Sequence, residues 1–325
     1  MIIQKGEIKL IIKPNSEFIR YTGWWEINEI TASSTANGNY FEFSYFGECA
    51  VIGFDISNAK QPVPHVYISV DNGAKIEVPL DKHIRISAKI GKHDVTVILK
   101  SAVELQHRWY TPVETKVSVN EIEADSFNVL AADEREIIEF IGDSITEGLS
   151  IDDHYDNMIY SGDATAGYAW KTAEMLNMRP VMFGYGGLGI TTCGNGGVPA
   201  AALSYGFYCN GHPAEALNSK IIVINFGTND IKCKDKNIYK QKYKEFLSVV
   251  RHRNPNSVII ALSPFSGLIT KETEDAVENY NQSANDKVFF VNTDGWIDAK
   301  PIHPNRYSHT IVSRKLTDTI RKRIK

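Results

Sequence analysis

The segment that most constrains the fold is an apolar run that ends abruptly in a polar turn. Residues Ile137–Ile141 are mostly branched and apolar, which is typical of a buried strand. Gly142 permits a sharp turn, and Asp143 and Ser144 favour the N-terminus of a following helix. Open α/β sheets bind their ligands at the carboxyl ends of the strands. The segment therefore predicts a serine at such an edge, although a strand, a turn and a helix cap explain the same residues on their own.

After Glu134, apolar runs alternate with longer segments of helical period, which is typical of βαβ units and a parallel sheet. The expected strands are Ile137–Ile141, Val181–Phe183, Ile221–Phe226, Val258–Leu262 and Val288–Val291. The expected helices are Gly167–Asn177, Lys236–Arg253, Thr273–Asn285 and Ser308–Lys325. Residues 198–213 show little regular pattern and are expected to form a long loop. We therefore expect a three-layer α/β/α domain over residues 131–325, with a five-stranded parallel sheet.

The first 130 residues have a different character. Short alternating runs such as Tyr40–Phe46, Ile84–Ile86 and His93–Leu99 are separated by Gly, Pro and Asn. Asn72-Gly73 lies between two such runs and is a strong hairpin signal. This pattern predicts an all-β sandwich of jelly-roll type over residues 1–130.

Composition excludes several functional classes. The 325 residues carry a net charge of −4, so neither a nucleic acid nor an anionic membrane is an expected partner. No segment has the length and apolarity of a membrane span, and the N-terminus lacks the features of a signal peptide. We expect a cytoplasmic protein, or a secreted one if this chain is a processed form. The four cysteines lack metal-binding spacing, so no metal or other cofactor is expected.

Four features that suit acyl transfer follow the first, second, third and fifth of the expected strands. They are Ser144, the glycine cluster Gly184–Gly189, the motif Gly227–Asp230, and His303 with Pro304. A serine hydroxyl becomes nucleophilic when a histidine takes its proton, and the developing oxyanion needs fixed donors. The backbone N–H of Ser144, a backbone N–H near Gly187 and the amide of Asn229 would supply them. Each feature taken alone is also explained as an ordinary loop or helix cap, and the glycine spacing does not match a phosphate-binding loop.

In their order and residues, these blocks resemble those of the SGNH, or GDSL-type, hydrolases over residues 136–325. The resemblance implies a flavodoxin-like fold, Ser144 as nucleophile, Gly187 and Asn229 as oxyanion donors, and His303 as general base. The family often has an aspartate three residues before the histidine, where this chain has Lys300. Asp298 is the nearest acid and is the candidate third member of a triad. If no carboxylate reaches His303, a backbone carbonyl would orient a Ser-His dyad.

The β half in front of this domain narrows the resemblance to carbohydrate esterase family two, which joins a jelly-roll domain to an SGNH domain. That resemblance implies removal of O-acetyl groups from plant polysaccharides or oligosaccharides of the xylan or mannan type. Trp296, seven residues before His303, is the expected sugar-stacking residue, and Tyr185 is expected to line the acyl pocket. The alternatives are a short-chain lipid or thioester hydrolase of the same fold and a non-catalytic carbohydrate-binding protein.

Overall fold

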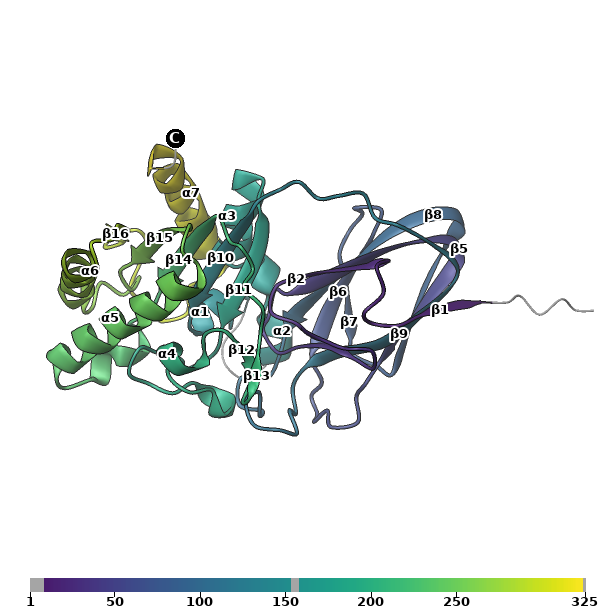
Figure 1. The fold of residues 1–325 in the computed structure, drawn as a ribbon, viewed down its shortest axis with the longest axis horizontal. Helices are drawn as coiled ribbons and strands as arrows, with labels where there is room; N and C mark the ends of the chain where they lie inside the picture. The colour runs from purple at the N-terminus through teal and green to yellow at the C-terminus, as the bar shows by residue number, and fades with distance from the viewer. Residues whose placement is uncertain (1–8, 153–157, 324–325) are drawn as a thin grey trace, which may run out of the picture.

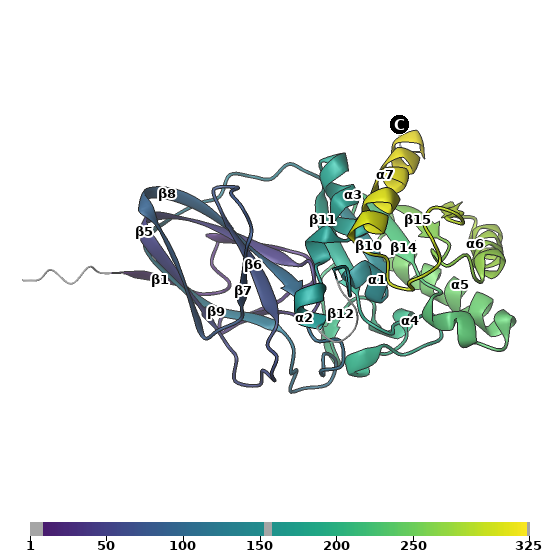
Figure 2. The same cartoon turned by 180° about the vertical axis from the view of Figure 1, so that it is seen from behind.

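The computed structural model describes residues 9–152 and 158–323. They form an antiparallel β half and an α/β half, which lie side by side along the long axis of the molecule (Figure 1). Figure 2 shows the same two halves from behind. Among the described helices, none combines the length and the apolar character that crossing a bilayer requires.

The β half consists of strands paired in antiparallel fashion. Its described strands are β1 (Leu10–Ile12), β2 (Ile19–Thr22), β3 (Glu26–Ile27), β4 (Ala32–Ser34), β5 (Tyr40–Phe54), β6 (His65–Val70), β7 (Ile76–Pro79), β8 (His83–Ser101) and β9 (Val117–Asn128). The strand order is β3-β4-β9-β5-β8-β6-β7, with β1 beside β9 and β2 beside β5. The hairpin predicted at Asn72-Gly73 is confirmed as β6 and β7.

The expectation of short strands is wrong for β5 and β8, which span 15 and 19 residues. Gly47 and Gly91, which look like breaks in the sequence, are paired with each other, and the register shifts between Gly47 and Cys49. Because a bulge bends a strand without ending it, both strands continue through the bend. Both strands contribute to the core of this half, β5 with Phe41, Phe43 and other buried apolar side chains.

The second half confirms the predicted α/β fold. Its parallel sheet has the order β11-β10-β14-β15-β16, formed by β10 (Ile137–Gly142), β11 (Arg179–Gly184), β14 (Ile221–Asn225), β15 (Val258–Leu262) and β16 (Val288–Val291). The larger helices are α3 (Tyr168–Leu176), α5 (Lys236–Arg253), α6 (Thr270–Ala284) and α7 (Arg306–Arg323). The shorter elements are α1 (Ser144–Glu147), α2 (Met158–Ser161), η2 (Ala164–Ala166), η3 (Asn195–Gly197), α4 (Ala201–Ser204), β12 (Phe207–Cys209), β13 (His212–Pro213) and η4 (Asn229–Lys232).

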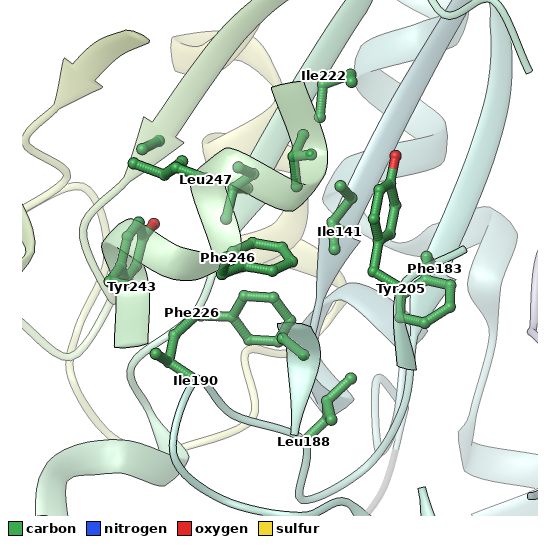
Figure 3. Close-up of a cluster of buried hydrophobic side chains, with 14 of the residues drawn as sticks. Ile141, Phe183, Leu188, Ile190, Tyr205, Ile222, Phe226, Tyr243, Phe246 and Leu247 are labelled. Atoms are coloured by element: carbon green, nitrogen blue, oxygen red, sulfur yellow. The ribbon is translucent and has the colours of Figure 1, made fainter. Parts of the chain in front are cut away.

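Buried side chains on the two faces of the parallel sheet form two separate cores. On one face, Ile141 and Phe183 pack with side chains of α5 and α6, including Phe246 and Leu247 (Figure 3). On the other face, strand residues such as Phe140 pack with side chains of α3 and α7. This arrangement gives the three layers and leaves the carboxyl ends of the strands free to carry functional loops.

The two halves of the chain share a buried aromatic contact. Trp24 of the β half packs edge-on against Phe183 and Tyr205 of the α/β half, with ring centroids 5.4 and 5.3 Å apart. Trp24 is 2% exposed. The β half therefore contributes to the core of its neighbour.

Candidate active site

The serine of the Gly-Asp-Ser turn lies at the N-terminus of a short helix. Strand β10 ends at Gly142, Asp143 is the N-cap of α1, and Ser144 is the first residue of that helix. The Asp143 carboxylate accepts a hydrogen bond of 2.9 Å from the backbone N–H of Ile145, which fixes the turn. A Cβ atom at position 142 would lie 2.8 Å from the carbonyl oxygen of Asn225, so the turn requires glycine. The strand end thus holds Ser144 in one defined position.

A histidine from the far end of the chain reaches this serine. His303 lies between β16 and α7, 159 residues after Ser144. Its Nε2 atom lies 2.8 Å from Ser144 Oγ, which is a hydrogen-bond distance. Burial lowers the pKa of His303 below its ordinary value. The imidazole is therefore neutral near pH 7 and is placed to accept the serine proton.

Asn229 and the glycine loop, residues 184–189, are joined by a hydrogen bond. Asn229 begins η4 just after β14, and its Nδ2 donates to the carbonyl oxygen of Leu188 over 2.9 Å. An amide nitrogen carries two hydrogens, so this bond leaves the second one for another acceptor. Gly187, the residue before Leu188, has a φ of 70°, a backbone conformation that favours glycine. Two of the predicted oxyanion donors are thus fixed to each other through Leu188.

The neighbouring carboxylate of Asp230 anchors the segment that follows the glycine loop. It accepts hydrogen bonds from the backbone N–H groups of Ile190 and Thr191, at 3.0 and 2.7 Å, and from the Thr191 hydroxyl. Burial raises the pKa of Asp143 to about 7, and the charge of Asp230 adds to the rise. Sequence reasoning missed the anchoring role of Asp230, although this residue completes the Gly-Thr-Asn-Asp motif and could have been found there.

Comparison with known families identifies the chain. A profile described as the GDSL-like Lipase/Acylhydrolase family matches residues 140–311, more than half of the chain. The chain belongs to this family. Membership makes it a carboxylic ester hydrolase. A comparison with curated protein sequences finds no match.

Solved structures extend the similarity of this GDSL-like hydrolase to its β half. A family two carbohydrate esterase from Cellvibrio japonicus has a TM-score of 0.80 at 19% identity, over 97% of this chain and 98% of that one. An acetyl xylan esterase from the rumen bacterium Butyrivibrio proteoclasticus has a TM-score of 0.79 at 21% identity, over 97% and 99%. A family two carbohydrate esterase from Clostridium thermocellum, solved with cellohexaose, has a TM-score of 0.70 at 22% identity, over 94% and 99%. The predicted combination of a β domain with an SGNH-type domain is confirmed at the level of the fold.

The structure does not bring the predicted third triad member to the histidine. Asp298 is exposed, and the described residues show no hydrogen bond or ion pair between its carboxylate and His303. Asp294, the next acid along the chain, instead accepts a hydrogen bond of 2.8 Å from the hydroxyl of Thr270, the first residue of α6. Among the described residues of the GDSL-like hydrolase, neither aspartate forms a hydrogen bond or ion pair with His303.

Tyr185, which is predicted to line the acyl pocket, is buried where the two halves of the chain meet. It is 4% exposed, and its hydroxyl lies 2.9 Å from the Thr35 hydroxyl of the β half. Its ring lies edge-on to Phe183. The reason is that the strand before the glycine loop points this side chain toward the domain interface, so Tyr185 joins the two halves of the GDSL-like hydrolase.

Trp296 is half-buried, and its stacking on a sugar stays a prediction. Its ring is partly buried against the core on the α3 and α7 side. The ammonium of Lys315 lies 6.0 Å from the ring centroid and also donates to the Trp296 carbonyl oxygen over 3.2 Å. The indole therefore secures α7 of the GDSL-like hydrolase to the loop that carries His303.

The described residues of the GDSL-like hydrolase contain no group of three or more His, Cys, Asp or Glu side chains placed to hold a metal ion. Its site as described consists of a serine, an imidazole and amide donors. Such an arrangement can form and break an acyl-enzyme.

Proposed function

We propose that this hydrolase is a serine esterase that removes O-acetyl groups from plant polysaccharides or oligosaccharides of the xylan or mannan type. The observation that carries the proposal is the distance of 2.8 Å between Ser144 Oγ and His303 Nε2. Two structural relatives support the substrate class, since one is an acetyl xylan esterase and another was solved with cellohexaose.

The first half-reaction transfers the acetyl group to the enzyme. His303 Nε2 takes the proton of Ser144 as the serine oxygen attacks the acetyl carbonyl carbon. The carbonyl oxygen becomes an oxyanion, which the N–H groups of Ser144 and Gly187 and the amide of Asn229 stabilise. The bond to the sugar oxygen then breaks, and the protonated imidazole gives its proton to the departing sugar hydroxyl.

The second half-reaction returns the enzyme to its starting state. A water molecule takes the place of the sugar, and His303 removes its proton as the water oxygen attacks the acetyl-enzyme. The same donors stabilise the second oxyanion, acetate leaves, and Ser144 regains its proton. In this proposal Asp298 takes no part, because its carboxylate is exposed and is not bonded to the imidazole.

The proposal is tested by measuring the release of acetate from acetylated xylan, acetylated mannan and monosaccharide acetates. We expect release from the polysaccharides or their oligosaccharides, with NMR showing which ring positions lose the group. Ser144→Ala should release no acetate and gives the background rate. Ser248→Ala, at an exposed serine on α5, is the matched control and should keep full activity.

Aryl esters of different chain length separate this function from lipid or thioester hydrolysis. A sugar deacetylase needs room only for an acetyl group, so the aryl acetate should be hydrolysed much faster than the aryl octanoate. A preference for octanoate, with no acetate released from any sugar, would contradict the proposal. Binding of the sugars without any ester hydrolysis would contradict it equally.

A further inference from the structure

A buried ion pair joins the β half to the helix that carries Ser144. Arg108 lies in the segment 102–116 between β8 and β9, and Glu147 is the last residue of α1. Arg108 Nη1 lies 2.5 Å from Glu147 Oε1, and the two side chains are 1% and 0% exposed. Asn37, also from the β half, donates to the same carboxylate oxygen over 3.2 Å. Such a pair is held in one geometry, because neither charge has access to water.

Glu147 contacts the glycine loop as well as belonging to α1. A Cβ atom on Gly184 would lie 2.7 Å from the backbone nitrogen of Glu147, so the loop and the helix touch backbone to backbone. Burial raises the pKa of the Glu147 carboxyl, and the Arg108 guanidinium and the backbone N–H of Gly186 oppose that rise. The nearby charge of Glu104 adds to the rise, while Arg108 and Asn37 of the β half both bind one oxygen of this carboxylate.

Arg108 contacts the glycine loop and the segment packed against it. Its guanidinium carbon lies 5.7 Å from the centroid of the Tyr185 ring, and its backbone N–H donates to the Gly196 carbonyl oxygen over 3.0 Å. The adjacent Asn195 donates its backbone N–H to the Gly186 carbonyl oxygen over 2.8 Å. Tyr185 and Gly186, the two residues before Gly187, are thus bound by contacts that lead to Arg108.

We propose that Arg108 and Glu147 are positioning residues, which hold α1 and the glycine loop so that the N–H groups of Ser144 and Gly187 face one oxyanion. Neither side chain touches the reacting atoms. The inference rests on the proposed serine mechanism, but it does not depend on the identity of the sugar. It makes the β half a functional part of the active site.

The experiment compares Arg108→Met, Glu147→Gln and the double variant with the full-length wild-type chain. We measure kcat and KM for 4-nitrophenyl acetate, the rate at which a fluorophosphonate modifies Ser144, and the melting temperature. Each single variant should lose about 10²-fold in kcat, as when one oxyanion donor is lost, with little change in KM. The rate of phosphonate modification should fall in parallel, because that reaction also develops charge on an oxygen.

The double variant separates positioning from stability. Removing both charges of the pair leaves neither partner as an unpaired buried ion, so the melting temperature of the double variant should recover toward that of the wild type. If the pair positions the loop, kcat stays low in the double variant. Recovery of kcat together with stability would overturn the inference, as would a folded single variant with wild-type kcat. Arg108→Lys, which keeps the charge, provides a further folded variant and should lose less in kcat than Arg108→Met.

Arg253→Met is the matched control. Arg253 at the C-terminus of α5 also bridges the two halves, with its guanidinium carbon 5.7 Å from the centroid of the Trp24 ring. Arg253 lies at the end of the parallel sheet opposite Ser144, so the kcat of Arg253→Met should stay within a few-fold of the wild-type value. If the wild type releases no acetate from sugars, the proposed function fails. The ratios of variant to wild-type rates with the aryl ester and the phosphonate still decide the role of Arg108 in that case.

Discussion

His303 is the residue whose ionisation decides whether the proposed reaction can begin. Only the neutral imidazole accepts the serine proton, and burial lowers its pKa below 6.5. A lowered pKa means that the neutral form persists to more acidic pH. We therefore expect the acid limb of kcat/KM for an aryl acetate to have its midpoint below pH 6.5, with a fall of about tenfold for each pH unit below that midpoint. An acid limb with its midpoint above 6.5 would contradict this assignment.

The carboxylate of Asp298 is not needed for turnover in the proposed mechanism. Because its carboxylate is exposed and is not bonded to His303, Asp298→Asn should change kcat only a few-fold. Asp294→Asn is a suitable control, since Asp294 bonds to Thr270. Steady-state kinetics with an aryl acetate suffice for the comparison. A loss of about 10⁴-fold in the Asp298 variant alone would show that the carboxylate orients the imidazole during turnover.

At the scale of the elements, the sequence located the loops that carry Ser144, Asn229 and His303. Each of these loops follows a short apolar strand, and a local run of branched side chains marks such a strand clearly. The parallel order then brings the loop ends together at one edge of the sheet. Two of the strands, Val258–Leu262 and Val288–Val291, have the bounds predicted.

Elements that depend on distant partners were not predictable. Residues 198–213 were expected to be an irregular loop but contain α4 and the strands β12 and β13. The position of Tyr185 within the glycine loop does not reveal that its hydroxyl pairs with Thr35 of the β half. Arg108 lies in a segment without helix or strand periodicity, so nothing in the neighbouring sequence indicates that it pairs with Glu147.

At the scale of the whole molecule, the β half contacts the α/β half at several separate places. Besides Trp24, the ammonium of Lys100 donates to the carbonyl oxygens of Ile159 and Tyr160, each over 3.0 Å. The Tyr67 hydroxyl donates to the Asp163 carboxylate over 3.1 Å. Such contacts join the two halves, and the similarity of fold to a solved family two carbohydrate esterase covers 97% of the chain.

The central claim is that the whole fold brings together a serine from one end of the hydrolase domain and a histidine from the other to form an acetyl-enzyme. Rapid acid quenching of the wild type during turnover of an acetyl ester, followed by peptide mass spectrometry, tests it most directly. We predict one acetyl group on the peptide that contains Ser144, and a loss of more than about 10⁴-fold in acetate release for Ser144→Ala. Acetate release at the wild-type rate by a folded Ser144→Ala variant would contradict the account.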